Sequence, residues 1–116
     1  MATNFNVFSW IFSGGGDSRE ALSRLMNKGR AARDKGAWRR AERCFAKANA
    51  MAQRIGAFRE AGDALFILSG LRLMEKDLRS SHQMARDAAD IYDQIGEAVL
   101  KAQAERLVAT AKALSR

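Results

Sequence analysis

Proline is absent from this 116-residue sequence, and cysteine and histidine occur once each. The lack of proline, together with abundant alanine, arginine, leucine and methionine, is typical of a helical chain. The single cysteine, Cys44, excludes an internal disulfide and gives no reason to expect secretion. The single imidazole, His82, has no second histidine or cysteine near it, which argues against a metal site.

Long hydrophobic runs are also missing. A membrane span needs about 20 apolar residues, and a secretory signal needs a basic leading region with small residues at a cleavage site. Neither pattern is present. The length suits one small domain with a modest core. We therefore expect a single all-α domain in the cytoplasm, and the alanine- and arginine-rich composition is a feature of GC-rich bacterial genomes.

Acidic side chains are scarce in the first half of the chain. Residues 19–60 carry twelve basic and four acidic side chains, whereas residues 61–116 carry eight of each. The basic patch consists of Arg30, Arg33, Lys35, Arg39, Arg40, Arg43 and Lys47. Such a patch can attract anionic lipid, nucleic acid or an acidic protein, or can form a solvated helix face. Nucleic acid is the least expected, because no aromatic residues are interleaved for base stacking.

The first sixteen residues form a separate piece, a predicted anchor peptide and its tether. They hold no charged side chain, and the anchor residues are Phe5, Phe8, Trp10, Ile11 and Phe12. Residues 13–16, a serine and three glycines, form the tether. Helix and strand patterns both fit the anchor. Because such a set exposed to water promotes aggregation, we expect it in the chain's own groove, in a partner's pocket or in a lipid interface.

Residues 17–116 contain apolar positions at spacings of three and four, which predict five helices. The first begins at an acidic capping box, Asp17 with Glu20, and ends before Gly36. The others are expected at residues 38–55, 58–74, 78–95 and 98–114. Loops this short make the helices antiparallel neighbours. The expected inward positions are Ala21, Leu22, Leu25, Met26, Gly29 and Ala32; Trp38, Ala41, Cys44, Phe45, Ala48, Met51, Ala52 and Ile55; Ala61, Ala64, Leu65, Phe66, Ile67, Leu68 and Leu71; Leu78, Ser81, Met84, Ala85, Ala88, Ile91, Tyr92 and Ile95; and Val99, Ala102, Leu107, Ala111 and Leu114.

The chain repeats itself forty residues apart. Residues 37–57 are echoed by residues 77–97, with Met51 matched by Ile91 and the helix-ending Gly56 matched by Gly96. Recurrence at a fixed period is typical of a stacked array of helix pairs. Each pair in such an array buries its apolar face against the next, which leaves an open surface whose usual use is to hold another protein.

The helix pairs resemble the tetratricopeptide repeat. In the first pair Gly29, Ala41, Phe45 and Ala48 stand at the family's spacing of small and aromatic residues. The second pair has Ser69, Ser81, Ala85 and Ala88 there, so it keeps small residues and loses the aromatic. The family's closing proline is missing from both, and the period exceeds the usual 34 residues. The longer helices are similar to the extended repeats of kinesin light chains and of bacterial Rap-type and mitotic-orientation scaffolds.

The resemblance covers residues 18–116 and implies a short solenoid with a protein-binding role. In this family the first helix of each pair lines the inner surface. The inner-face residues that it implies are Arg24, Lys28, Ala31, Leu65, Ser69 and Arg72. Cations there favour an acidic peptide or a carboxylate terminus.

Catalytic constellations are not found in the sequence, and we expect neither enzymatic activity nor a cofactor. Cys44 lies on an apolar stripe, which favours core packing over a nucleophile. Gly14–Gly16 precede a helix, but the Lys and Ser/Thr of a phosphate loop are missing. The acidic residues Asp87, Asp90, Asp93 and Glu97 share a helix face, where they form a solvated edge or pair with the basic half of a neighbouring copy.

The sequence therefore predicts a non-enzymatic adaptor that docks a protein on its inner face and is tethered to a larger assembly by the anchor peptide. The alternative is a peripheral membrane protein, in which the anchor inserts and the basic half lies on anionic lipid. A short array also makes a homo-oligomer a possible state.

Overall fold

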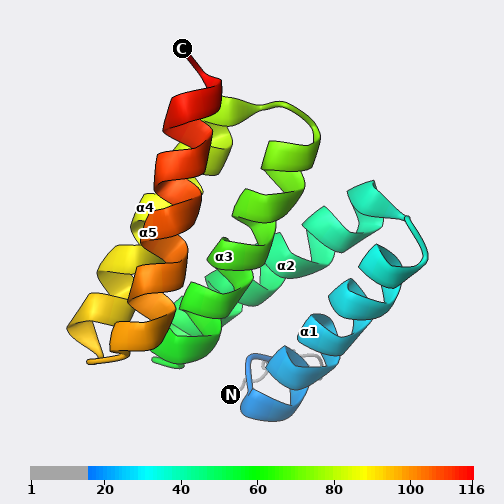
Figure 1. Cartoon of the computed structure of the whole chain (residues 1–116). Coiled ribbons are helices and arrows are strands. Elements are labelled where there is room, and N and C mark those ends of the chain that lie inside the picture. The colour runs from blue at the N-terminus through cyan, green and yellow to red at the C-terminus, as the bar shows by residue number, and fades with distance from the viewer. Residues whose placement is uncertain (1–15) are drawn as a thin grey trace, which may run out of the picture.

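The computed structural model describes residues 16–116, which form five helices and no strand (Figure 1). The helices are α1 (Arg19–Asp34), α2 (Trp38–Arg54), α3 (Phe58–Met74), α4 (Leu78–Gln94) and α5 (Ala98–Leu114). Their bounds agree with the predicted ones to within two residues. The predicted anchor residues Phe5, Phe8, Trp10, Ile11 and Phe12 lie outside the described residues.

The predicted capping box at the start of α1 is wrong by one residue. Ser18 is the N-cap, and its hydroxyl accepts a hydrogen bond of 3.0 Å from the Ala21 backbone N–H. Asp17 instead accepts from the Arg54 guanidinium at 2.6 and 3.0 Å, and this hydrogen bonding lowers the pKa of the Asp17 carboxyl. The Asp17 carboxylate therefore links the start of α1 to the end of α2.

All four loops close the preceding helix in the same way. In the first loop Gly36, at φ +76°, donates to the Arg33 carbonyl, and Ala37 donates to the Ala32 carbonyl at 2.8 Å. This pair of bonds is the Schellman motif, which requires a left-handed residue after the helix. Gly56 and Gly96 fill that position in the second and fourth loops. Lys76 fills it in the third at φ +64°, a conformation that costs a residue with a Cβ more than it costs glycine.

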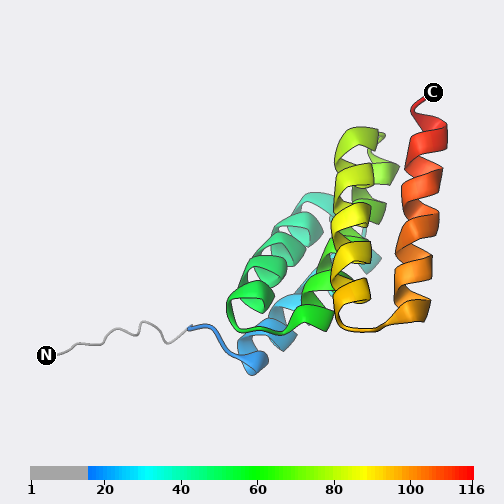
Figure 2. The same ribbon diagram turned by 90° about the vertical axis from the view of Figure 1, so that its left-hand side faces the viewer.

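Consecutive helices pack against each other and alternate in direction, as predicted (Figures 1 and 2). The odd-numbered helices form one layer, which faces the viewer in Figure 1, and α2 and α4 lie behind it. A further contact joins α3 to α5 within the first layer. The arrangement is all-α and solenoid-like, because each helix contacts mainly its sequence neighbours.

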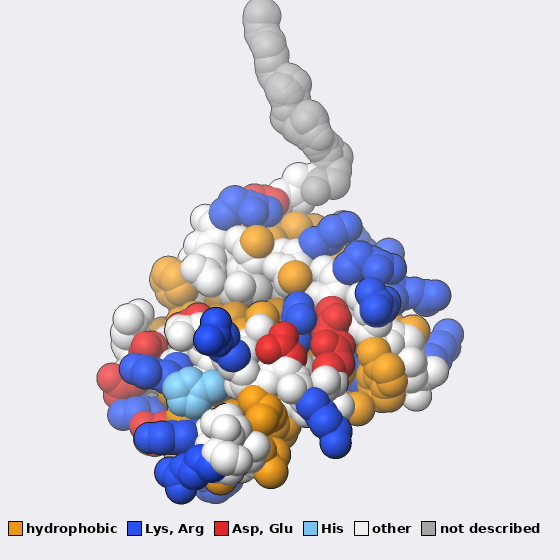
Figure 3. Space-filling view, turned by 90° about the horizontal axis from the view of Figure 1, so that it is seen from above, with side chains coloured by type: hydrophobic (Ala, Val, Ile, Leu, Met, Phe, Trp, Pro, Cys, Tyr) orange, Lys and Arg blue, Asp and Glu red, His pale blue; other side chains and the backbone are white. Residues whose placement is uncertain are grey.

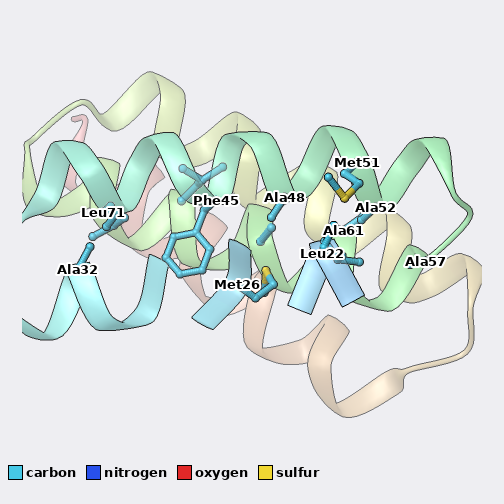
Figure 4. Packing of buried hydrophobic residues seen from close by; sticks show 14 residues of the cluster. Leu22, Met26, Ala32, Phe45, Ala48, Met51, Ala52, Ala57, Ala61 and Leu71 are labelled. Atoms are coloured by element: carbon cyan, nitrogen blue, oxygen red, sulfur yellow. The ribbon is translucent and has the colours of Figure 1, made fainter. Parts of the chain in front are cut away.

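The first core cluster lies where α1, α2 and α3 meet (Figure 4). Its central side chain, Phe45 of α2, is fully buried. A Cβ built on Gly29 of α1 would lie 2.8 to 3.0 Å from the Phe45 ring, so only glycine allows this approach. The glycine and the aromatic that carry the family resemblance are therefore in direct contact.

The second cluster lies between α3, α4 and α5. It has the same kind of close contact between a glycine and an aromatic ring, at a different position along the helices. Here Tyr92 of α4 is the large buried side chain, and a Cβ built on Gly62 would lie 2.7 Å from its ring. Gly62 and Tyr92 are each seven residues, or about two turns, from Ser69 and Ala85, the counterparts of Gly29 and Phe45. Because the helices are antiparallel, both shifts run the same way. The aromatic–glycine contact has therefore moved along the pair rather than disappeared.

In the second pair, serines occupy the positions that Gly29 and Ala41 hold in the first pair. Ser69 and Ser81 are fully buried, and the Ser69 hydroxyl donates to the Ser81 carbonyl at 2.7 Å. A buried hydroxyl is tolerated when it is hydrogen-bonded in this way.

Five predicted inward positions are wrong because they lie at element ends or on the unpartnered side of α5. Trp38 begins α2 and is 41% exposed, and Ile95 follows the last residue of α4 and is 38% exposed. Val99, Ala102 and Leu114 of α5 are exposed, Val99 at 72%. Charged residues Glu105 and Arg106 occupy the positions that Leu65 and Phe66 hold in α3. Among residues 16–116, nothing covers the outer side of α5, and it is exposed.

Candidate partner-binding surface

An open apolar groove of about 350 Å³ lies on the layer of odd-numbered helices. Its lining residues are Arg33 of α1; Phe66, Ile67, Gly70, Leu71 and Met74 of α3; and Leu107 of α5. Arg33 is the one charged side chain among them, and Met74 is 59% exposed. This combination offers apolar contacts in the centre and a cation at the edge.

The groove exists because α3 is apolar on three sides. One side packs on α2 through Ala64, Leu68 and Leu71, and a second meets α4 through Leu65. The third side, which contains Ile67, lines the groove. A Cβ built on Gly70 would meet no atom of residues 16–116 within 4 Å, so the groove is open at this position. Space for a foreign side chain therefore lies directly above Gly70.

A polar depression of about 150 Å³ lies between α1 and α3, nearer than the groove to the amino-terminal end of α3. Arg19 of α1 pairs with Glu60 of α3 at 3.3 Å across it. Asp63, which also lines it, accepts a 2.5 Å hydrogen bond from the Tyr92 hydroxyl. Burial and the Asp63 carboxylate both raise the pKa of Tyr92 above its usual range. These carboxylates are already paired, so the depression adds hydrogen-bonding groups rather than net charge.

The six inner-face residues implied by the resemblance do not form one surface. Leu65 is buried against α4, and Ser69 is fully buried and bonded to Ser81, so these two predictions are wrong. The reason is that both positions belong to the side of α3 that contacts α4. Arg72 is partly buried among carboxylates, as described below.

The remaining three, Arg24, Lys28 and Ala31, are exposed. Their counterparts in α3, forty residues on, are Ala64, Leu68 and Leu71, which pack on the preceding helix α2. In α1 the same side has no preceding helix among residues 16–116. Arg24, Lys28 and Ala31 are thus on the outer edge of the array, away from the groove.

Arg72 lies within a partly buried charge cluster at the end of the molecule that carries the α1–α2 and α3–α4 loops. Its guanidinium is 3.7 Å from Glu42, 3.9 Å from Glu75 and 3.6 Å from Asp77. The distances exceed hydrogen-bonding range, and the facing atoms of Arg72 and Glu42 have no hydrogen-bond partner in the part of the chain that the structure describes. Burial, together with the nearby Glu75 carboxylate, raises the pKa of Glu42. The positive charge of Arg72 is therefore balanced by carboxylates of its own chain.

The seven members of the basic patch lie along the second half of α1, the first loop and the first half of α2. All are exposed except Arg33, which is partly buried at the groove. Among the described residues Arg33 has one close carboxylate, that of its neighbour Asp34 at 3.7 Å. Figure 3, seen from above, shows Lys and Arg side chains gathered beside a smaller group of carboxylates. The patch therefore borders the groove at Arg33.

The remaining polar candidates are dispersed. Cys44 is buried in α2, as its stripe predicts, and His82 is half-buried on α4. Asp93 of α4 pairs with Lys101 at 2.9 Å, and Glu97, which lies beyond α4 as the N-cap of α5, pairs with Arg59 at 3.8 Å, so two of the four acidic residues are paired within the chain. Within residues 16–116 no group of three or more potential ligands could hold a metal ion.

No protein-family model matches the chain, and neither the curated proteins nor the solved structures contain a significant match. Of the helices described, none is both long enough and apolar enough to span a bilayer. The groove was missed by sequence reasoning, although one signal points to it. Ile67 and Leu107 are apolar at equivalent positions of α3 and α5, and both line the groove.

Proposed function

We propose that this chain is a non-enzymatic protein-binding module of the tetratricopeptide type, and that its partner docks on the layer formed by α1, α3 and α5. The observation that carries the proposal is the open apolar groove at Ile67, Gly70 and Leu107. Apolar grooves between helices are a common place for a peptide's anchoring side chains. The groove lies on the first helices of the pairs, the layer that the resemblance assigns to binding.

The groove and its border define the chemistry of the partner. Its volume of about 350 Å³ accommodates a small number of large apolar side chains. Arg33 at the edge, with exposed Arg30 one turn before it, favours a carboxylate next to those side chains. The partner is therefore a peptide segment with apolar anchors and an adjacent acidic residue. The anchor peptide of this chain supplies a second attachment to a larger assembly.

Partner capture from the source cells with the full-length chain tests the proposal. Leu107→Glu places a carboxylate in the groove, and Val99→Glu, eight residues earlier on the same helix and 72% exposed, is the matched control. Partners that bind the groove should be lost with Leu107→Glu and kept with Val99→Glu. Capture of the same proteins in equal amounts by both variants would contradict the proposal. Circular dichroism of each variant checks that the helices are intact.

A second function, binding to anionic membranes, is favoured by one observation, the exposure of six of the seven cations of the basic patch. About 1 kcal/mol per cation is expected near an anionic surface at low salt. Flotation with vesicles that contain phosphatidylserine separates the two functions. Binding that falls when Arg39, Arg40 and Arg43 are changed to Glu supports the membrane function. Binding that is absent from the unchanged protein rules it out.

A further inference from the structure

We propose that, when no partner is present, the groove is occupied by this chain's own anchor peptide, residues 5–12, which makes the module self-inhibited. The partner then binds by displacing that segment. This inference goes beyond the proposed function, since a partner can use the groove whether or not the anchor peptide competes for it.

The anchor peptide and the groove are chemically alike, because both are largely apolar. The first sixteen residues contain no charged side chain, and six of the eight residues from 5 to 12 are large and apolar. The groove is lined by six residues without charge and by Arg33 at its edge. By contrast, the polar depression between α1 and α3 is lined by four charged side chains, those of Arg19, Arg30, Glu60 and Asp63. An uncharged aromatic segment therefore gains most in the groove, because one of its seven lining residues is charged and four of the seven that line the depression are, so fewer charged groups have to lose water.

The point of attachment lies within reach of the groove. Asp17 is held by Arg54 at 2.6 Å, and Arg19 by Glu60 at 3.3 Å, so the chain enters the fold beside the start of α3. Gly70 is ten residues beyond Glu60, about 15 Å along the helix. The four residues 13–16 span at most about 14 Å when extended, and each residue before them adds about 3.4 Å. Residues 8–12 can therefore reach Gly70 without any change in the helices.

The short tether also favours the chain's own groove over that of a second copy. A segment joined through a few residues has an effective concentration in the millimolar range at sites that it can reach. A second copy in solution competes only when the protein itself approaches that concentration. Contact within one chain is thus the expected state of dilute protein.

Tryptophan fluorescence can test the contact in the full-length protein. Trp38→Phe leaves Trp10, in the anchor peptide, as the only tryptophan. Trp38 is at the start of α2 and does not line the groove, so its loss leaves the lining intact. Acrylamide quenching of Trp10 is then measured at low micromolar protein, in the folded chain and in urea. We expect severalfold weaker quenching in the folded chain, with emission shifted to the blue.

Groove variants in the Trp38→Phe background identify the site of protection. Leu107→Glu, or separately Met74→Glu at an already exposed position, should restore most of the quenching seen in urea, whereas Val99→Glu should not. Trp10 as quenchable in the folded chain as in urea would overturn the proposal. So would protection that both groove variants leave intact, protection lost on dilution, or protection seen only with vesicles. None of these results removes a partner from the groove, so the proposed function would survive them.

Discussion

Replacing Gly29 by alanine tests the contact that joins α1 to α2. Alanine is favoured over glycine inside a helix by about 1 kcal/mol, so a structurally neutral change would stabilise the protein. Here the added Cβ would lie 2.8 to 3.0 Å from three atoms of the fully buried Phe45 ring. Overpacking of this kind costs about 1–3 kcal/mol, because the ring cannot move without displacing its neighbours.

Gly70→Ala is the matched control, since Gly70 is also inside a helix but a Cβ there would meet no atom of the described helices within 4 Å. It should raise the free energy of unfolding by up to about 1 kcal/mol. The two variants should therefore differ by about 1–3 kcal/mol, with Gly29→Ala the less stable. Urea unfolding followed by far-ultraviolet circular dichroism measures the difference.

Shortening the aromatic side chain shows whether Phe45 is the cause. Phe45→Leu opens a cavity and destabilises the protein on its own. In that background Gly29→Ala should cost less, because the Cβ then has room, and the double-mutant cycle should give a coupling of about 1 kcal/mol or more. Equal stability of Gly29→Ala and Gly70→Ala, or a coupling of zero, would refute the argument that this glycine is required by the ring.

Three further perturbations test other parts of the fold. Lys76→Gly should stabilise the protein by up to about 1 kcal/mol in urea unfolding, because a left-handed residue with a Cβ is strained, and Gly96→Ala should destabilise it by a similar amount. Equal effects of the same sign would argue against the loop geometry. The raised pKa of Glu42 means that its contribution to stability is complete below its ordinary pKa of 4.5 and is lost as the pH rises through the higher folded value. Glu42→Gln should therefore remove part of the stability gained on mild acidification, and an unchanged pH profile of the urea midpoint would contradict the assignment. The double variant Glu105→Leu, Arg106→Phe gives α5 the apolar residues that α3 has at these positions. Light scattering should then show more self-association than in the unchanged chain, because apolar side chains are exposed on α5. An unchanged mass would argue that this side of α5 is not exposed to solvent.

The helix bounds could be predicted from the sequence because local rules decide them. Gly36, Gly56 and Gly96 each follow a helix at the left-handed position, and the forty-residue period places the third loop, where Lys76 takes the glycine's role. The start of α1 was harder, since Asp17 and Ser18 are both good caps. The ion pair of Asp17 with Arg54, a residue far along the chain, leaves Ser18 as the cap.

The assignment of faces was harder because periodicity shows that a residue is inward without showing which helix it meets. The resemblance places Leu65 and Ser69 on the inner face of a first helix, although periodicity already marks Leu65 as inward, and both face α4 because α3 has neighbours on two sides. The groove also depends on a relation between helices, with Ile67 and Leu107 forty residues apart. The contact of Gly62 with Tyr92 is a third example, because it lies two turns from the position that the first pair uses.

Docking of a partner in the groove is tested most directly by a titration that is followed through methyl signals. The full-length chain with ¹³C-methyl methionine reports on Met74, which lines the groove, and on Met51, which is buried in the first core cluster. Adding the partner recovered by capture should shift or broaden the Met74 signal and leave that of Met51 in place. A Met74 signal that is unchanged at saturating partner would contradict the account.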